Sequence, residues 1–181
     1  LPSQFLENWC WEREALDLFA RHHETGEPIP EDLFQRMTAS RNFQAAMQMV
    51  RQLEFSLFDL RLHVEHDRAA GERIFALLEE VRDQVAVVRP PAFNRFPNSF
   101  AHIFAGGYAA GYYSYKWAEV LSADAFARFT EEGIFNPVTG RAFLEHILEK
   151  GGSEDAAKLF RDFRGREPSI EPLLRASGLA A

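Results

Sequence analysis

The sequence has 181 residues, of which 46% are hydrophobic and 26% are charged, a composition typical of a soluble globular protein. Its formal net charge of −7 argues against a nucleic-acid partner, because nucleic-acid binding needs a basic face. No apolar run approaches the roughly 20 residues that a membrane-spanning helix needs, so no membrane partner is expected. The single cysteine, Cys10, excludes an internal disulfide and is consistent with a reducing cytoplasm.

Apolar residues recur at three- and four-residue spacing through most of the chain, and no segment alternates apolar and polar residues over a sustained length. This pattern predicts an all-α fold. A chain of this length can bury roughly 70% of its unfolded surface, which is enough for one domain with a sizeable core. Helices are expected over about residues 2–21, 30–38, 40–64, 71–88, 105–130 (or from 108), 141–150, 153–163 and 170–176.

The longest expected helix follows Ser40, whose hydroxyl can cap its first turn. Its apolar residues form a stripe over about six turns that we expect to be buried. The stripe consists of Phe43, Ala46, Met47, Val50, Leu53, Leu57, Leu60 and Val64. The expected helix over residues 71–88 has an inner face made of Ile74, Leu77, Leu78, Val81 and Val85.

Two pairs of histidines are of a type that can bind metal. His22 and His23 are adjacent, and adjacent residues on a helix point about 100° apart, so they cannot easily converge on one ion. A solvated helix end is therefore the favoured interpretation. His63 and His66 stand three residues apart and could share a helix face, which leaves a structural metal open there beside a solvated helix terminus.

All four tyrosines of the chain fall within eight residues, in a stretch that runs from Phe93 to Trp117. Read as one helix, Tyr108, Tyr112 and Tyr115 are spaced i, i+4 and i+7, which places three phenols on one side. Tyr113 points elsewhere. One interpretation is that these rings are core or interface residues with their hydroxyls bonded at the edge. The other interpretation is that the stretch handles a substrate.

Two glycines, Gly106 and Gly107, come just before the first tyrosine, and His102 precedes them. Upstream prolines keep a helix from forming across the approach, because proline lacks an amide donor and restricts the residue before it. The sequence therefore predicts a loop with a glycine joint that delivers a histidine and a row of phenols to the start of a helix. A Gly-Gly pair is also typical of a plain turn, and both interpretations stay open.

The segment from His102 to Trp117, HIFAGGYAAGYYSYKW, resembles the substrate-binding loop and helix of the oligopeptidase A, dipeptidyl carboxypeptidase and thimet oligopeptidase family. These are zinc metallopeptidases that cut short peptides inside cells. The opening residues 1–12, LPSQFLENWCWE, resemble the start of a helix beside the metal in this family. The run FNPVTG at residues 135–140 and the terminal helices resemble its carboxyl end. The resemblance covers nearly the whole chain and is closest to the bacterial oligopeptidase A members.

This resemblance implies that residues 1–181 form an all-α, C-terminal fragment of a larger peptidase catalytic domain, with the substrate loop and helix at about residues 93–130. In the family, the residues matching Leu1 to Gln4 follow the glutamate that completes the zinc site, and a His-Glu-x-x-His helix lies further upstream. This sequence contains no His-Glu-x-x-His. We therefore expect zinc in the full-length enzyme, and neither a metal ligand, bound zinc nor activity in this fragment alone.

The same resemblance implies short peptides as substrates, a cytoplasmic location, and the missing N-terminal part of the enzyme as a partner. Apolar surface left bare by truncation would favour self-association of the fragment. Two other interpretations stay open, namely a non-enzymatic helical module that grips a peptide or a partner helix, and a helical structural domain with no site. A gene that continues upstream into His-Glu-x-x-His, with a glutamate immediately before Leu1, would favour the peptidase.

The resemblance also implies roles for single residues. Tyr115 matches the tyrosine assigned to oxyanion stabilisation, and Tyr108 matches one that binds near the scissile bond, so both are expected to be catalytic. His102 matches a substrate-contacting histidine on a mobile loop, and Tyr112 matches a further tyrosine that faces the substrate cleft. Between His102 and Tyr108 the chain has one residue more than the thimet-type members, and it agrees there with the bacterial ones.

Two further groups of residues are implied to support the site. Gly106–Gly107 lie in the loop after His102 and would let it close over a bound peptide. At the start of the chain, Glu7, Asn8, Trp9 and Glu12 follow closely on the position of the family's zinc-binding glutamate. We expect these four residues to orient the metal ligands without binding the metal themselves.

Overall fold

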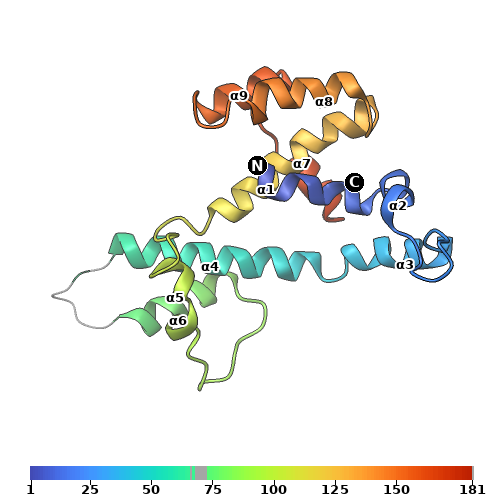
Figure 1. The fold of residues 1–181 in the computed structure, drawn as a ribbon. Helices are drawn as coiled ribbons and strands as arrows, with labels where there is room; N and C mark the ends of the chain where they lie inside the picture. Colours follow the sequence, from blue (N-terminus) through green and yellow to red (C-terminus); the bar gives the residue numbers. More distant parts are fainter. Residues whose placement is uncertain (66, 68–72, 181) are drawn as a thin grey trace. The chain divides into compact units, whose positions relative to one another are not determined.

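The computed structural model describes residues 1–65, 67 and 73–180. Among these residues every regular element is a helix, and the one β-type contact is an isolated bridge between Arg21 and Pro28. The prediction of an all-α fold is confirmed. No helix in this part of the chain is long and apolar enough to cross a membrane. The elements (Figure 1) are α1 (Pro2–Phe5), η1 (Leu6–Trp11), α2 (Arg13–Phe19), α3 (Glu31–Arg41), α4 (Ala45–Glu65), α5 (Ile74–Val85), α6 (Phe96–Ser99), η3 (Ala101–Ile103), α7 (Ser114–Glu132), α8 (Pro137–Phe143), η4 (Leu144–Leu148), α9 (Ala156–Arg164) and α10 (Glu171–Ala176).

Contacts divide the chain into two compact units. The first unit contains Leu1–Phe43 and Ala118–Ala181, and the second contains Gln44–Trp117. The opening segment and the terminal helices thus belong to the first unit. The second unit holds α4, α5, α6 and the whole tyrosine stretch, together with the first turn of α7.

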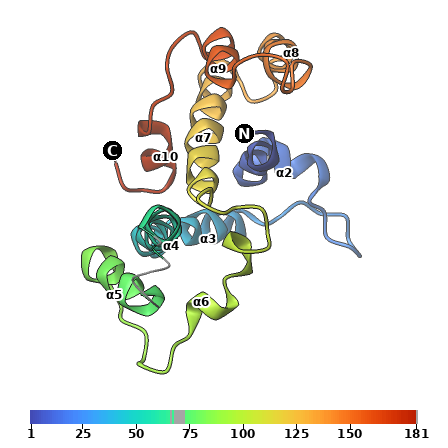
Figure 2. The ribbon, with the colours of Figure 1, turned by 90° about the vertical axis from the view of Figure 1, so that its left-hand side faces the viewer.

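The core of the first unit is built largely from phenylalanine rings, several of them on α7, α8 and α9, which lie together in Figure 2. Phe5 of α1 stacks on Phe143 of α8 with ring centroids 4.1 Å apart, and it meets Phe129 of α7 edge-on at 5.6 Å. Phe163 of α9 contacts Phe143 at 5.3 Å. Each ring contributes roughly 1.5–3 kcal/mol by leaving water. The opening segment of the chain is thereby fixed to α7 and α8.

The second unit packs α5 against α4, and the two helices lie side by side in both views (Figures 1 and 2). The inner face predicted for α5 is confirmed, since Leu77, Leu78 and Val81 are buried and Ile74 and Val85 pack against the same cluster. Phe100 and Ile103 are buried in this cluster as well. They come from the segment that leads into the tyrosine stretch, so the core of the second unit also seats that stretch.

The long first helix predicted over residues 2–21 is interrupted. Residues 6–11 wind as a 3₁₀ helix, and Glu12 is extended with φ −99° and ψ 126° before α2 begins. The break lets Arg13 donate to the carbonyl of Ile29 at 2.8 Å and pair with Asp17 at 3.0 Å. These contacts tie α2 to the segment before α3, so tertiary bonds override the helical propensity of the sequence at Glu12.

The predicted start and the predicted buried stripe of α4 are also wrong. Ser40 lies inside α3, where its hydroxyl donates to the carbonyl of Met37 at 2.6 Å instead of capping α4. None of the eight residues of the predicted stripe is buried, since Val50, Leu57 and Leu60 are half-buried and the other five are exposed, and the buried apolar residues of α4 are Phe58 and Leu62. The buried positions of α4 include two carboxylates, Glu54 and Asp59. A stripe of apolar residues cannot reveal this, because the buried acids are held by donors that lie far along the chain.

Candidate functional site

The tyrosine stretch enters α7 later than the sequence predicts. The helix begins at Ser114, and residues 108–113 form turns before it. Gly107 has φ +79°, and Ala110 has φ +54° although it is not glycine. An α-helix cannot continue through such left-handed residues. The prediction that Tyr108 and Tyr112 lie on a helix at i and i+4 is therefore wrong.

The phenols nevertheless come together. The rings of Tyr108 and Tyr115 stack with centroids 4.9 Å apart, and Tyr112 meets Tyr115 edge-on at 5.2 Å. The ring of His102 lies 6.2 Å from both Tyr108 and Tyr112. Tyr113 is exposed. The structure thus brings together four of the residues singled out in the sequence, His102, Tyr108, Tyr112 and Tyr115, which we call the tyrosine site.

The environment of Tyr115 favours its protonated form. A hydrogen bond between Tyr108 and Tyr115 raises the pKa of Tyr115 above its ordinary value, and burial and the neighbouring phenols of Tyr108 and Tyr112 act in the same direction. An ordinary tyrosine already has a pKa of about 10. Tyr115 therefore remains neutral at physiological pH and can donate a hydrogen bond without carrying a charge.

Tyr112 is held at its hydroxyl and around its ring. The hydroxyl donates to the Gln52 side-chain carbonyl at 3.0 Å. The ring packs edge-on against Phe100 at 5.0 Å and against Phe55 at 5.8 Å. Gln52 and Phe55 lie on α4, so this helix fixes one phenol of the site at several points. Neither residue was identified from the sequence.

A third residue of α4 that sequence reasoning missed contacts the turn itself. Asp59 is fully buried, and its carboxylate oxygens accept hydrogen bonds from the backbone amides of Ala110 and Tyr112, each at 2.9 Å. The signal available in the sequence was an acid in the middle of an apolar stripe, between Leu57 and Leu60. Such an acid must find donors when it is buried.

The glycine pair has a defined place in the loop before the tyrosines. A Cβ atom on Gly106 would lie 2.7 Å from Cα and 2.9 Å from the carbonyl oxygen of His102, closer than real contacts allow. Gly107 has a positive φ, which glycine adopts without strain. The amide of Tyr108 donates to the His102 carbonyl at 3.1 Å. Both glycines are thus needed for a tight turn that brings His102 back to Tyr108.

The four residues predicted near the metal lie in the first unit. Asn8 donates from its side-chain amide to the carbonyl of Phe5 at 2.8 Å and to the hydroxyl of Ser122 at 3.0 Å. Trp9 donates from its indole to the carbonyl of Ile134 at 3.0 Å. Both side chains therefore brace the opening segment against α7 and the loop after it.

The acids of this group have different surroundings. Glu7 is exposed and, with Asn8 and Arg41, lines a cavity of about 290 Å³. Glu12 forms the extended break before α2. Burial lowers the pKa of Arg41, although the charges of Glu12 and Glu7 act against this shift. The charges of the two acids therefore act on a cation of the chain itself.

The histidines differ from their predicted setting. His22 and His23 follow the end of α2 in a turn, where their rings stack with centroids 5.0 Å apart. With Glu24 they form the one group of three metal-binding side chains found among the described residues, and all three are exposed. The argument that a helix keeps His22 and His23 apart is therefore wrong.

His22 and His63, which lie outside the tyrosine site, already have partners, and the tyrosine site itself has too few ligands for zinc. Nδ1 of His22 accepts hydrogen bonds from the backbone amides of Glu24 and Thr25 at 3.3 and 3.2 Å. His63 lies against Asp59, and His66 lies outside the described residues. Within the described part of the chain, the tyrosine site includes one histidine, His102, and no group of three ligands. Its residues do not fit a zinc ion without ligands from elsewhere.

Comparisons with known proteins give the family. A family model described as peptidase family M3 matches residues 1–179. Oligopeptidase A of Salmonella typhimurium is 58% identical over 179 residues, which cover 99% of this chain and 26% of that protein. Probable cytosolic oligopeptidase A of Arabidopsis thaliana is 49% identical over 185 residues, covering 100% of this chain and 26% of the relative. Dipeptidyl carboxypeptidase of Escherichia coli is 37% identical over 183 residues, covering 98% and 26%.

The chain spans about a quarter of the length of these relatives, since 26% of each is covered. The resemblance inferred from the tyrosine stretch and from the opening segment is confirmed by matches over nearly all of the chain. The chain belongs to peptidase family M3.

Proposed function

We propose that this chain is the C-terminal part of an intracellular, zinc-dependent oligopeptidase, and that its tyrosine site binds short peptides and stabilises the charge that forms as they are cleaved. The observation that carries the proposal is the convergence of three phenols and His102 on one another. The relatives' names, oligopeptidase A and dipeptidyl carboxypeptidase, support a peptide substrate. The name of the Arabidopsis relative supports a cytoplasmic location.

Tyr115 is the residue that we assign to the developing oxyanion. When a carbonyl carbon becomes tetrahedral, its oxygen gains negative charge and needs a preorganised donor. The raised pKa of Tyr115 keeps its proton available for this bond. Zinc, when bound in the full-length enzyme, supplies the polarising charge at the same carbonyl. Its ligands are proposed to lie outside residues 1–181.

Tyr108 is the second residue that we assign to catalysis, and the other members of the tyrosine site are assigned to substrate binding. Tyr108 is stacked on Tyr115 and hydrogen-bonded to it, so it can contact the peptide beside the scissile bond while it orients Tyr115. His102 is exposed on the loop, where it can reach the peptide backbone. Tyr112 faces the same group of rings. Gly106–Gly107 let the loop that carries His102 close over the peptide.

The opening segment is assigned to the surroundings of the metal. We propose that Glu7, Asn8, Trp9 and Glu12 support the zinc ligands, which the rest of the enzyme supplies. Large apolar side chains such as Leu6, Phe43 and Phe93 are more than 70% exposed. Exposed apolar side chains mark an interaction site where they form a contiguous patch. These exposed side chains support the N-terminal part of the enzyme as a partner, and self-association of the fragment when that part is absent.

A matched cleavage assay tests the proposed function. We expect the full-length protein to cleave a quenched short peptide, and a zinc chelator to abolish that cleavage. Residues 1–181 alone should cleave nothing, with or without the chelator. Cleavage by the fragment would mean that the metal site is within it, with His22 and His23 the first candidates to test. No cleavage by either protein would favour a non-enzymatic helical module that binds a peptide or partner.

The glycine loop gives a second prediction. In the full-length enzyme, Gly106→Ala should lower kcat/KM by about 10- to 100-fold, the cost of a displacement of about 1 Å near the reacting groups. The new Cβ meets backbone atoms of His102 at 2.7 and 2.9 Å, and these cannot rotate away. The loop must therefore move and carry His102 away from the phenols. Steady-state kinetics on a short peptide measure the loss.

Gly111→Ala is the matched control for this prediction. A Cβ on Gly111 meets its nearest neighbour, the carbonyl oxygen of Tyr108, at 3.5 Å, which is an ordinary contact. We expect its kcat/KM to stay within about twofold of the wild-type value. Equal losses in the Gly106 and Gly111 variants would show that the space beside Gly106 has no special part in catalysis.

A further inference from the structure

We propose that Asp59 is a positioning residue of the peptidase, which holds the turn that carries Tyr108 and Tyr112 in its active geometry. It acts through backbone amides and through Tyr112, without touching the substrate. The inference rests on the proposed function of the tyrosine site. Nothing in the resemblance to known peptidases pointed to this residue.

The Asp59 carboxylate clamps the turn, in the sense that it binds two backbone amides of the turn at once. One carboxylate oxygen accepts the amide of Ala110 and the other accepts the amide of Tyr112, each at 2.9 Å. The two amides lie two residues apart, so a single side chain fixes both sides of the turn. Hydrogen bonds to an ionised acceptor are roughly twice as strong as neutral ones. The turn is therefore held by the strongest type of bond available to a backbone amide.

The turn needs such a clamp because of Ala110. This residue has φ +54°, in the left-handed region. For a residue with a side chain, that conformation costs on the order of 1–2 kcal/mol. Alanine also favours the helical conformation more than any other residue. Without the bonds to Asp59, the segment before Ser114 would tend to extend α7 backwards, which would rotate Tyr108 and Tyr112 away from their present positions.

Asp59 is itself fixed from a second side. Nδ1 of His63 lies 3.0 Å from a carboxylate oxygen of Asp59 and 2.9 Å from its backbone carbonyl. Both neighbours are acceptors, so Nδ1 carries the proton and donates. His63 is one turn further along α4. The Asp59 carboxylate thus accepts three hydrogen bonds. The one from His63, on the same helix, fixes its orientation.

Tyr112 connects Asp59 with Tyr115, the proposed oxyanion donor. Tyr112 is bonded at its amide to Asp59 and at its hydroxyl to Gln52, both on α4. Its ring then meets the ring of Tyr115 at 5.2 Å. Placing a fully buried carboxylate in a helix costs free energy unless it is well paired. The two amide bonds offset this cost and explain why a carboxylate is buried at this position. No other described residue bonds the turn at both amides.

A purely structural role is the alternative, and a buried acid on the same helix serves as the control. Glu54 is 2% exposed and pairs with Arg82 at 3.0 Å and with Arg51 at 2.6 Å. Both partners lie outside the tyrosine turn. Glu54→Gln therefore removes a buried charge from α4, as Asp59→Asn does, but leaves the bonds at Ala110 and Tyr112 in place.

The test compares the two variants in the full-length enzyme, below the unfolding temperature of both. We expect Asp59→Asn to lower kcat by about 100-fold with a much smaller change in KM. The new side-chain amide keeps one acceptor and presents a donor to the other backbone amide. Hydrogen–deuterium exchange should become faster at the amides of Ala110 and Tyr112. In Glu54→Gln, kcat should stay within about twofold and exchange at these amides should not change.

A milder variant covers the case in which Asp59→Asn does not fold. His63→Ala leaves both amide bonds but removes the donor that orients the carboxylate. It should lower kcat by about fivefold, less than Asp59→Asn because both amide bonds remain, with a smaller rise in exchange at the same two amides. Wild-type kcat and wild-type exchange in His63→Ala would then overturn the proposal.

Other outcomes are also decisive. If Asp59→Asn is less stable but keeps its kcat, Asp59 is only structural. If Asp59→Asn and Glu54→Gln lose kcat equally, the loss reflects general destabilisation and the positioning role is wrong. If the wild-type enzyme cleaves no peptide, the proposed function fails, and the exchange data still decide separately whether Asp59 holds the turn.

Discussion

In the full-length enzyme, Tyr115→Phe is expected to lower kcat by about 10²- to 10³-fold, the loss that follows removal of one oxyanion donor. The change removes a hydroxyl and leaves the ring. The ring can still stack on Tyr108 and meet Tyr112, which lie 4.9 and 5.2 Å away. Packing in the tyrosine site is therefore kept, and the variant removes only the hydrogen bonds of the Tyr115 hydroxyl, including the one with Tyr108.

The pattern of the kinetic constants is as informative as the size of the loss. An interaction made only in the transition state lowers kcat and kcat/KM equally when it is removed. We therefore expect KM of Tyr115→Phe to change by no more than a few-fold. A raised KM with an unchanged kcat would instead mean that Tyr115 binds the substrate in its ground state, and the assignment to the oxyanion would be wrong.

Tyr113→Phe is the matched control, because it is the same chemical change two residues away. Tyr113 is 48% exposed, whereas the ring of Tyr115 packs against two phenols of the site. Its kcat should stay within about twofold of the wild-type value. If Tyr113→Phe were as damaging as Tyr115→Phe, the loss could not be attributed to a donor in the tyrosine site.

The fold class and the membership of the tyrosine site could be predicted from the sequence, but the geometry of the site could not. Helical periodicity predicted the apolar part of the buried face of α5, which packs into an apolar cluster, but it did not reveal that Arg82 is buried there as well. The pattern also grouped Tyr108, Tyr112 and Tyr115. It did so for the wrong reason, since the first two lie in turns. Their roles in binding and catalysis remain proposals.

The error at Tyr108 and Tyr112 has a physical cause. Ala110 has a strong intrinsic preference for helix, which the neighbouring Gly111 weakens but does not reverse. In its left-handed conformation its amide donates to Asp59, which lies 51 residues earlier in the chain. Interactions at such a distance are not visible in local periodicity. The same holds for the break at Glu12, which depends on contacts that Arg13 makes with residues after α2.

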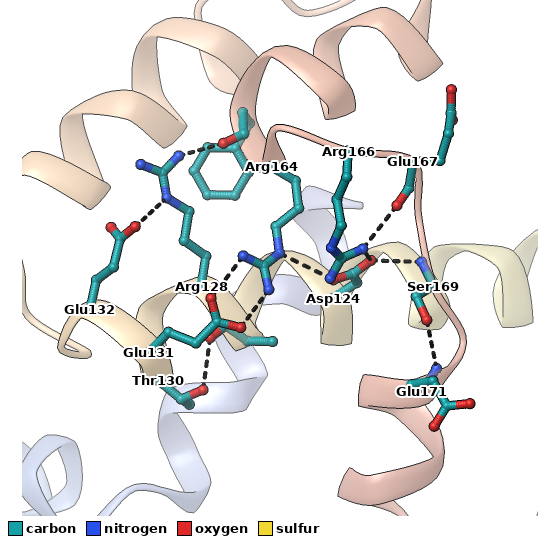
Figure 3. A network of polar contacts seen from close by, with 12 residues as sticks. Asp124, Arg128, Thr130, Glu131, Glu132, Arg164, Arg166, Glu167, Ser169 and Glu171 are labelled. Carbon is teal, nitrogen blue, oxygen red and sulfur yellow. Dashed lines mark hydrogen bonds and ion pairs between the residues drawn. The ribbon is translucent and has the colours of Figure 1, made fainter.

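The second prediction with a large effect concerns stability in the first unit. Asp124 of α7 is fully buried, and Figure 3 shows the donors that converge on it. Arg166 bonds both carboxylate oxygens, at 2.7 and 2.5 Å, and Arg164 reaches one of them at 3.2 Å. The amide of Ser169 donates at 2.7 Å. One carboxylate thus joins α7 to the end of α9 and to the segment before α10.

Asp124→Asn should lower the free energy of unfolding by about 3–5 kcal/mol at neutral pH, the cost of removing one partner from a buried ion pair. Arg164 keeps its bonds to Glu131 at 2.6 and 2.9 Å, but it loses its buried counter-charge. The asparagine also presents a donor where Arg166 or Ser169 already donates. Urea unfolding followed by circular dichroism measures the loss.

Asp162→Asn is the control, since it makes the same change at a surface pair. Asp162 and Lys158 both lie on the exposed side of α9, 2.6 Å apart. Exposed pairs contribute little to stability because water and salt screen them. The control should therefore unfold at nearly the wild-type urea concentration. An Asp124→Asn variant that is no less stable than this control would show that the network in Figure 3 does not hold the unit together.

The contribution of Asp124 should also make the stability of the protein depend on pH. Burial alone would raise the pKa of Asp124, but the hydrogen bonds from Arg166, Ser169 and Arg164 outweigh it and hold the pKa below its ordinary value. A carboxyl with a lowered pKa in the folded state stabilises the protein above its unfolded pKa, which for aspartate is about 4. That stabilisation is lost as the pH falls below about 4, towards the folded pKa. Wild-type protein should therefore lose more stability between pH 7 and pH 3 than Asp124→Asn does, and equal losses would mean that Asp124 is not the group responsible.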